Sequence, residues 1–166
     1  MSKKIKIMAL KNVADLKTGR NFADVLDSMH NRSNVQRVTA AGAFTIADTT
    51  TILSIAVDGA MGVVTMPAAI VGRNIRMYWE VEQATGDMVA TCAGSDTFAG
   101  NIFTSLEGNA AGDGDVVAIA NTTVAITFVD DVNIGSYVDF QCCSNGLWLT
   151  TGHLVIDALG SVPTLA

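Results

Sequence analysis

One stretch, residues 136–153, places the tightest limits on what this chain can fold into. Apolar and polar residues alternate along its first half, which is the period of a strand with one buried face. The buried side of this strand is predicted to carry Val138, Phe140 and Cys142. Asn145-Gly146 follows, a dipeptide that tolerates positive φ at both central positions of a tight turn. A return strand is expected from Leu147 to Thr151, ended by Gly152, so the stretch predicts a β-hairpin.

From Thr39 onwards the chain is predicted to be β almost throughout. Its composition, rich in Ala, Gly, Val and Thr, favours sheets with tight turns over helical bundles. Strands are predicted at Thr51–Val57, Gly62–Met66, Arg73–Glu82, Asp87–Cys92, Asp115–Ala120, Thr123–Val129, Ser136–Cys143 and Leu147–Thr151. In the third of these, Trp79 shares the buried face. The near-regular spacing indicates an all-β body over residues 39–166, a β-sandwich or a β-tulip or barrel-like fold.

The apolar content of the chain indicates assembly. Its mean hydropathy of +0.37 is high for a soluble monomer. No run approaches the roughly 20 apolar residues needed to span a bilayer, so no membrane partner is expected. The excess apolar surface is therefore expected to be buried against other subunits.

Charge is distributed very unevenly along the sequence. Residues 1–37 hold eight of the ten Lys and Arg with three acidic residues, whereas the remainder holds two arginines and thirteen acidic residues. Residues 1–38 are therefore predicted to form a basic N-terminal arm on an acidic body, with 31–38 as a polar connector. The basic residues expected to contact a partner are Lys3, Lys4, Lys6, Lys11, Lys17, Arg20, Arg32 and Arg37.

One short amphipathic helix is predicted within the arm, at about residues 22–30. Asn21 is a suitable N-cap, and the apolar residues recur at helical spacing. The apolar stripe consists of Phe22, Val25, Leu26 and Met29. A helix this short is marginal alone, so the stripe is expected to dock on its own body, on a neighbouring subunit or on another protein, with disorder of the segment as the remaining alternative.

Nothing in the sequence predicts catalysis, a cofactor or a metal site. The three cysteines form no disulfide framework and, with His153, match no zinc spacing. Asp113-Gly-Asp115 resembles only a fragment of a calcium loop. A serine nucleophile in a recognisable setting is absent from the sequence, so His153 is interpreted as a residue at a strand end. Nucleic acid is not an expected partner, because the acidic body would oppose a polyanion.

Three segments together resemble the phage capsid decoration, or cement, proteins. Thr65–Arg73 with the strand after it is similar to the T-L-P-x-x-x-x-G-x-x-(Y/F) stretch of that family. Residues 133–153 resemble its late hairpin with a Trp beyond a Gly turn, and residues 94–100 resemble its G-x-D-x-I-x-G turn. The resemblance covers roughly residues 40–155.

The resemblance implies a homotrimer on the outer capsid surface of a virion, where it clamps neighbouring major capsid subunits. The expected function is thus that of a non-enzymatic viral structural protein. An alternative is a receptor- or glycan-binding domain of a phage tail fibre or adhesin, because similar modules occur there. That alternative predicts exposed rings for stacking on sugars, with Tyr78, Tyr137 and Trp148 as candidates. A small hydrolase is the third hypothesis.

Overall fold

The computed structural model describes residues 34–107, 114–157 and 162–166. Within these ranges the protein is all-β and contains no helix, which confirms the predicted fold class. Residues Val35–Ala166 form one compact unit that holds every described strand. The predicted helix at about 22–30 lies outside the described residues.

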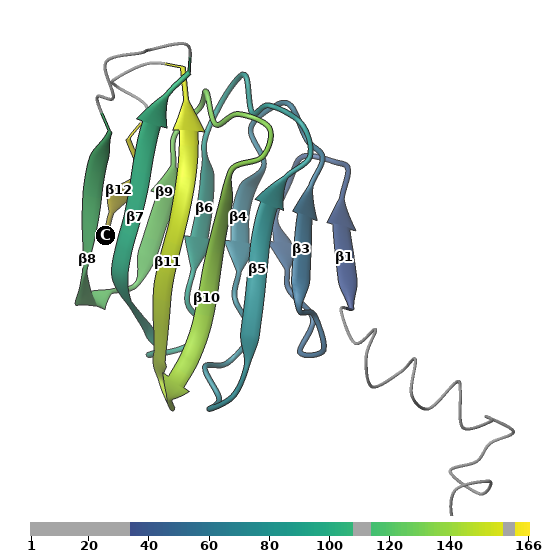
Figure 1. Cartoon of the computed structure of the whole chain (residues 1–166). Helices are drawn as coiled ribbons and strands as arrows, with labels where there is room; N and C mark the ends of the chain where they lie inside the picture. The colour runs from purple at the N-terminus through teal and green to yellow at the C-terminus, as the bar shows by residue number, and fades with distance from the viewer. Residues whose placement is uncertain (1–33, 108–113, 158–161) are drawn as a thin grey trace, which may run out of the picture. The chain divides into compact units, whose positions relative to one another are not determined.

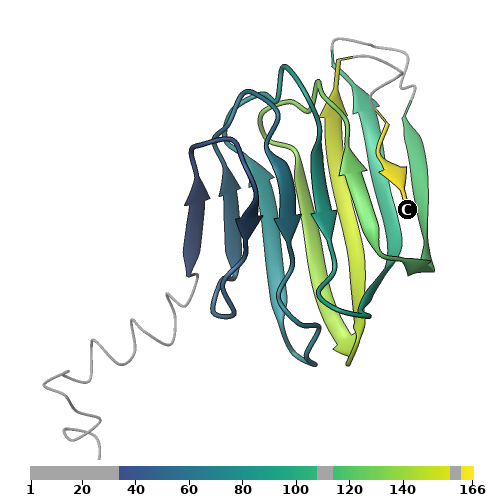
Figure 2. The same cartoon turned by 180° about the vertical axis from the view of Figure 1, so that it is seen from behind.

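The strands form two mixed sheets that face each other (Figure 1). The seven-stranded sheet consists, in spatial order, of β1 (Val35–Val38), β3 (Ile52–Ile55), β5 (Asn74–Trp79), β10 (Tyr137–Ser144), β11 (Leu147–Ile156), β7 (Thr97–Leu106) and β8 (Asp115–Thr123). The five-stranded sheet consists of β12 (Thr164–Leu165), β9 (Ala125–Phe128), β6 (Met88–Thr91), β4 (Gly62–Thr65) and β2 (Phe44–Thr45). Figure 2 shows the second sheet in front. The arrangement is a β-sandwich.

The first half of the body is wound from one sheet to the other. Odd-numbered strands β1, β3 and β5 are parallel neighbours in one sheet, and even-numbered strands β2, β4 and β6 are parallel neighbours in the other. Each parallel connection therefore passes through the opposite sheet. No repeat of fixed length marks this winding in the sequence, because the turns between the strands differ in length.

The predicted hairpin fills the centre of the seven-stranded sheet. β10 and β11 pair antiparallel on either side of the Asn145-Gly146 turn, which confirms that prediction. β10 then pairs with β5, and β11 pairs in parallel with β7 along its whole length. The hairpin thus joins the wound first half of the body to the β7–β8 pair.

Large apolar side chains fill the space between the sheets. Val138, Phe140 and Trp79 are at most 1% exposed, as predicted for the core. The rings of Trp79 on β5 and Phe128 on β9 meet edge to face, with centroids 5.3 Å apart, and so link the two sheets. Cys142 is buried whereas Cys143 is exposed, which follows from the alternation of a strand.

Three predictions of local structure are wrong. The connector assigned to 31–38 ends in strand β1, because Val35–Val38 pairs with β3. β11 does not stop at Gly152 but runs to Ile156, since β7 supplies a parallel partner of equal length, and His153 therefore lies within the strand. The strand β7 was not predicted at all, because its glycine and polar residues obscure the period of two.

Candidate interaction surface

The outer face of the seven-stranded sheet is the broadest surface that the fold builds from aligned side chains. The strand registers place one row of outward residues across all seven strands. This row contains Arg37, Ser54, Tyr78, Tyr137, His153, Phe103 and Val116. The character of the side chains changes along the row, from charged and phenolic to apolar.

The charged half of this face comprises the outward residues of β1, β3, β5 and β10, with Glu80 directly after β5. Arg76 donates two hydrogen bonds of 2.7 Å to the Asp139 carboxylate, and its guanidinium lies 4.9 Å from the centroid of the Tyr137 ring. Hydrogen bonding to Asp139 raises the pKa of Arg76. Arg37 Nε donates to Glu80 Oε2 at 2.6 Å. The neighbouring Ser54 hydroxyl and Arg37 guanidinium lower the pKa of Glu80.

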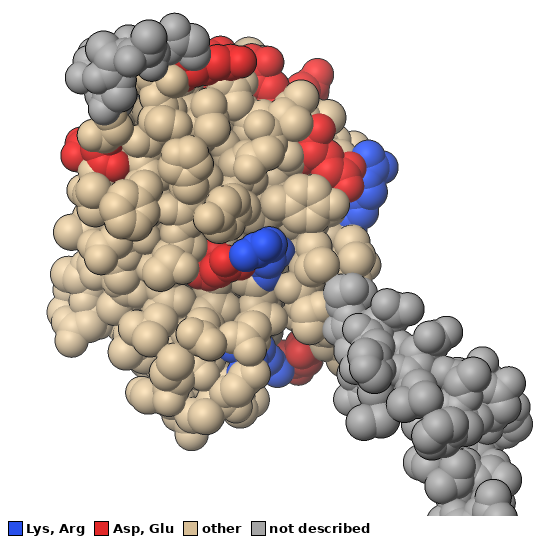
Figure 3. Space-filling model, viewed as in Figure 1, with Lys and Arg blue, Asp and Glu red and all other residues tan. Residues whose placement is uncertain are grey.

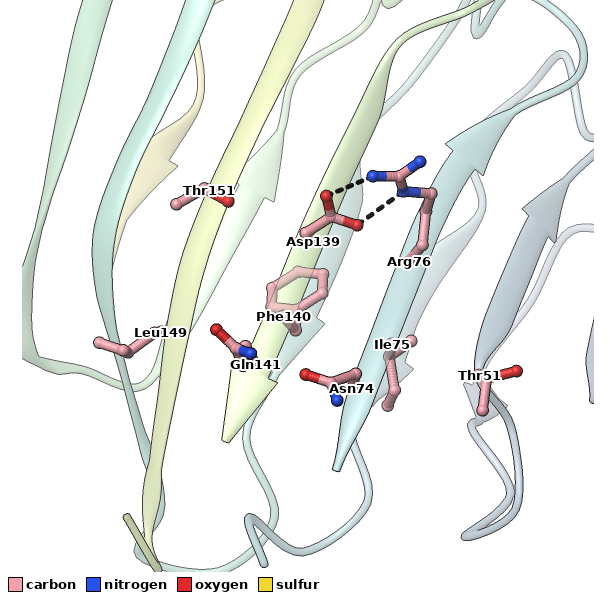
Figure 4. A pocket seen from close by; sticks show the side chains of 9 residues that line it. All are labelled: Thr51, Asn74, Ile75, Arg76, Asp139, Phe140, Gln141, Leu149 and Thr151. Atoms are coloured by element: carbon pink, nitrogen blue, oxygen red, sulfur yellow. Dashed lines mark hydrogen bonds and ion pairs between the residues drawn. The ribbon is translucent and has the colours of Figure 1, made fainter. Parts of the chain in front are cut away.

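A hollow of about 430 Å³ lies in the charged half, at its border with β11 (Figure 4). Its polar side chains include the amides of Asn74 and Gln141 and the Arg76–Asp139 pair. Leu149 on β11 supplies an apolar wall. Planar amide and carboxylate groups beside an apolar surface suit a polyhydroxylated ligand, which presents hydroxyl groups along one edge and C–H groups along another.

The uncharged half of the face comprises the outward residues of β11, β7 and β8. It contains no Asp, Glu, Lys or Arg. Its residues are Leu149, Thr151, His153, Val155, Ala99, Asn101, Phe103, Ser105, Val116 and Ala118. Phe103 is 51% exposed and Val116, directly opposite it on β8, is 49% exposed. Figure 3 shows this half as a continuous area of uncharged atoms, with acidic atoms only at its margin.

Large apolar side chains are concentrated on this sheet face. Of the eleven large hydrophobic residues that are exposed among the described residues, five point outward from the seven-stranded sheet. They are Val35, Phe103, Val116, Tyr137 and Leu149. Of these, only Phe103, Val116 and Leu149 lie in the uncharged half, where depletion of charge together with an exposed aromatic ring is the composition that distinguishes the centre of a protein–protein interface from ordinary surface.

Ser105 and His153 meet within the uncharged half, where Ser105 Oγ lies 3.0 Å from His153 Nε2. A serine beside a histidine is the first requirement of a nucleophilic site, and sequence spacing gave no sign of this pair. No carboxylate is recorded as a hydrogen-bond partner of His153 among the described residues, and the residues that line the hollow include neither member of the pair. The contact is therefore interpreted as a cross-strand pair that satisfies two polar side chains.

The three segments that carry the family resemblance meet at one end of the body, which we call the motif rim (residues 66–73, 93–97 and 142–146). Ala69 is the centre of this rim. Its N–H donates to Asp96 Oδ2 at 2.7 Å, and its carbonyl accepts from the N–H of Gly146 at 3.0 Å. Gly146 O in turn accepts from Thr97 N at 2.9 Å, which closes the network.

The rim presents two apolar side chains to the outside. Ile70 and Val71 are 53% and 58% exposed, and the N–H of Val71 donates to Asn145 Oδ1 at 3.1 Å. The two exposed residues are thus held on a backbone that is hydrogen-bonded on both sides. Periodicity alone could not locate them, because they lie in a connection between strands.

The residues predicted for partner binding fall mostly outside the described part of the chain. Those outside are Lys3, Lys4, Lys6, Lys11, Lys17, Arg20, Phe22, Val25, Leu26, Met29 and Arg32. Arg37 lies on β1, exposed and paired with Glu80. Of the rings considered for sugar stacking, Trp148 is fully buried, so that part of the prediction is wrong, whereas Tyr137 is 37% exposed.

The thiols and the acidic groups give no sign of a reactive or metal-binding centre in the described ranges. Burial raises the pKa of Cys92 to about 12 and also raises the pKa of Cys142, which keeps both thiols protonated. Residues 34–107, 114–157 and 162–166 contain no group of three or more His, Cys, Asp or Glu side chains placed to hold a metal ion. The same residues contain no helix long and apolar enough to cross a membrane.

Comparisons with protein-family models, with curated proteins and with solved structures found no match to this chain.

Proposed function

We propose that the protein is a non-enzymatic structural protein of a virion, which decorates the outer capsid surface as a homotrimer and stabilises neighbouring major capsid subunits. The observation that supports this proposal best is the motif rim, where the three segments that resemble capsid decoration proteins are joined by hydrogen bonds around Ala69. Because those segments are far apart in the sequence, their meeting gives the resemblance a common structural basis.

The rim is suited to docking on another protein. Ile70 and Val71 are apolar, exposed and anchored, so little conformational entropy is lost when they enter a pocket. Several such contacts, multiplied by the avidity of a trimer, would hold capsid subunits together although each contact is modest. The basic residues of the predicted arm would add attraction to an acidic capsid surface, and this attraction would weaken as salt is raised.

The proposal is tested by co-sedimentation of the full chain with capsids of a phage that encodes it. The double variant Ile70→Asp/Val71→Asp should lose at least about tenfold in affinity, because it places charge in an apolar contact. Ile134→Asp is the matched control, since Ile134 is 66% exposed but lies outside the rim. Equal binding by the two variants would contradict a role for the rim, and absence of wild-type binding would contradict the capsid role.

A second candidate function is the binding of a receptor glycan, and the hollow beside β11 favours it. Asn74 and Gln141 offer amide donors and acceptors there, next to Leu149 and the Arg76–Asp139 pair. The test is a glycan array probed with the wild type and with Asn74→Ala/Gln141→Ala. A signal that disappears in the double variant would favour this function, and a silent array would count against it.

A further inference from the structure

We infer that the uncharged half of the outer face is where the protein binds further copies of itself. This inference deepens the proposed function, on which it rests for the expectation of a trimer. The surface is defined by the outward residues of β11, β7 and β8, with Phe103 and Val116 as its large apolar members. Its occupant is a second copy of the same chain.

The charge distribution is compatible with a second copy as the occupant. The chain has a formal net charge of −6, so two copies repel each other at long range. The uncharged half carries no Asp, Glu, Lys or Arg, and contact there brings none of these charges together. A strongly basic partner would instead be matched by acidic side chains, which this half lacks.

The size of the surface is adequate for such a contact. Its three strands have ten, ten and nine residues. At about 3.3 Å per residue and about 4.8 Å between strands, they cover roughly 30 Å by 15 Å, or about 450 Å². Two copies that meet face to face would bury about 900 Å² of flat sheet area, at the small end of specific interfaces, which begin at roughly 1,000 Å². In a cyclic trimer the contacts are heterologous, so each copy would present one part of this surface to one neighbour and another part to the other.

The edge of the sheet supports the same occupant. β8 is an edge strand nine residues long, and Asp115 at its start is its one charged residue. Exposed edges are ordinarily protected by lysine, by proline or by a bulge. β8 has neither lysine nor proline, and its register with β7 is shifted only beyond Ile119. An edge strand of this kind, continuous with an uncharged face, requires cover in the assembled state.

The outer face of the five-stranded sheet is the competing surface. Its strands also carry no charged residue. Val63 and Leu165, however, are the large exposed hydrophobic side chains on its strands, and no aromatic side chain is among them. The seven-stranded sheet is therefore favoured, and Val63 supplies a control.

The test is the mass of the full chain in size-exclusion chromatography with light scattering, over a range of concentrations. The wild type is expected to be an oligomer. Phe103→Glu and Ala118→Glu should each raise the dissociation constant by about 30-fold or more, because each buries an unpaired charge between copies. Val35→Glu on β1 and Val63→Glu on β4 replace exposed apolar residues elsewhere and should leave the mass unchanged. Circular dichroism checks that all four variants are folded.

The outcomes separate this inference from the proposed function. A wild-type monomer, or an oligomer that survives both Phe103→Glu and Ala118→Glu, overturns the inference. Loss of the oligomer in Val63→Glu alone overturns it as well, in favour of the other sheet. If both variants of the uncharged half become monomeric while the wild type fails to sediment with capsids, the inference holds and the capsid role alone is contradicted.

Discussion

The two halves of the outer face belong to one sheet but are stabilised by different means. Strands of the charged half contain no glycine and are linked on the outside by ion pairs such as Arg76–Asp139. Strands of the uncharged half have no ion pair among their outward residues. Gly100 allows the backbone of β7 to approach β11 closely, and Gly152 allows β11 to approach β10. The difference is therefore not required by sheet formation, and it suggests that the two halves meet different surroundings.

The largest expected loss of stability is that of Gly100→Ala. This variant tests the close approach of the β7 and β11 backbones in the uncharged half. Gly100 has φ of +139°, and a Cβ there would lie 1.9 Å from the carbonyl oxygen of Thr150 on β11. Real Cβ atoms essentially never make so short a contact, and backbone atoms cannot yield as a side chain would. We expect a loss of more than about 4 kcal/mol in the free energy of unfolding, measured by urea denaturation.

Gly94→Ala is the matched control for that variant. Gly94 also has a positive φ, +57°, but a Cβ there would meet nothing within 4 Å. Its cost should be limited to about 1 kcal/mol of backbone strain. If the two variants were equally stable, strand approach at Gly100 would not be what limits the β7–β11 pair.

The next largest loss of stability is expected in the motif rim, whose hydrogen bonds connect the segment before β5 with the start of β7. Asp96, just before β7, accepts a hydrogen bond from Ala69 N in the connection that leads to β5. Asp96→Ala leaves this partly buried N–H without its acceptor and should cost about 1–3 kcal/mol in unfolding free energy. Asp58→Ala, at an exposed turn, is the control, and an equal effect of both changes would remove Asp96 from this role.

Sequence patterns predicted the parts of the fold that depend on local chemistry. The hairpin was predicted because Asn145-Gly146 specifies its turn, and its buried residues were predicted because they alternate. Strand β7 was not predicted, because it is stabilised by pairing with β11, which lies some fifty residues later in the chain. The uncharged half was not predicted for the same reason, because it exists only when three distant strands lie side by side.

The candidate site was even harder to predict from local sequence patterns than the fold. The arm was chosen for its charge, and among its predicted contact residues only Arg37 falls in the described part of the chain. Ile70 and Val71 could not be recognised, because exposure in a connection has no sequence period. The rim was not predicted, because the three segments meet through hydrogen bonds that no spacing rule predicts.

A smaller loss of unfolding free energy is expected from Asp139→Ala, which removes the Arg76–Asp139 ion pair of the charged half. This removes both hydrogen bonds from Arg76, but the two side chains are 35% and 55% exposed. Solvent screening limits the loss to about 0.5 kcal/mol, and the difference from wild type should shrink as salt is raised. Gln141→Ala, on the same face of β10, is the control. A loss above about 2 kcal/mol would mean that the charged half depends on this pair as the other half depends on Gly100.

The smallest effect is the pH dependence of stability contributed by Glu80, which is half-buried. Its pKa is lowered in the folded protein by the neighbouring Ser54 hydroxyl and Arg37 guanidinium. A lowered pKa contributes stability above the unfolded value, and this stability is lost as the pH falls through the folded value. The gap in urea midpoint between wild type and Glu80→Gln should therefore be present near neutral pH and narrow progressively as the pH falls below the ordinary value for glutamate.

Glu82→Gln changes the same charge two residues away and is the control for Glu80→Gln. A gap that widened in acid would reverse the sign of the effect and contradict the lowered pKa. The oligomeric mass of Glu80→Gln at neutral pH should equal that of wild type, because Glu80 borders β1 and β5 and is separate from the strands of the uncharged half. A change in that mass would show that the two halves act as one surface, and the division between them would then be one of composition alone.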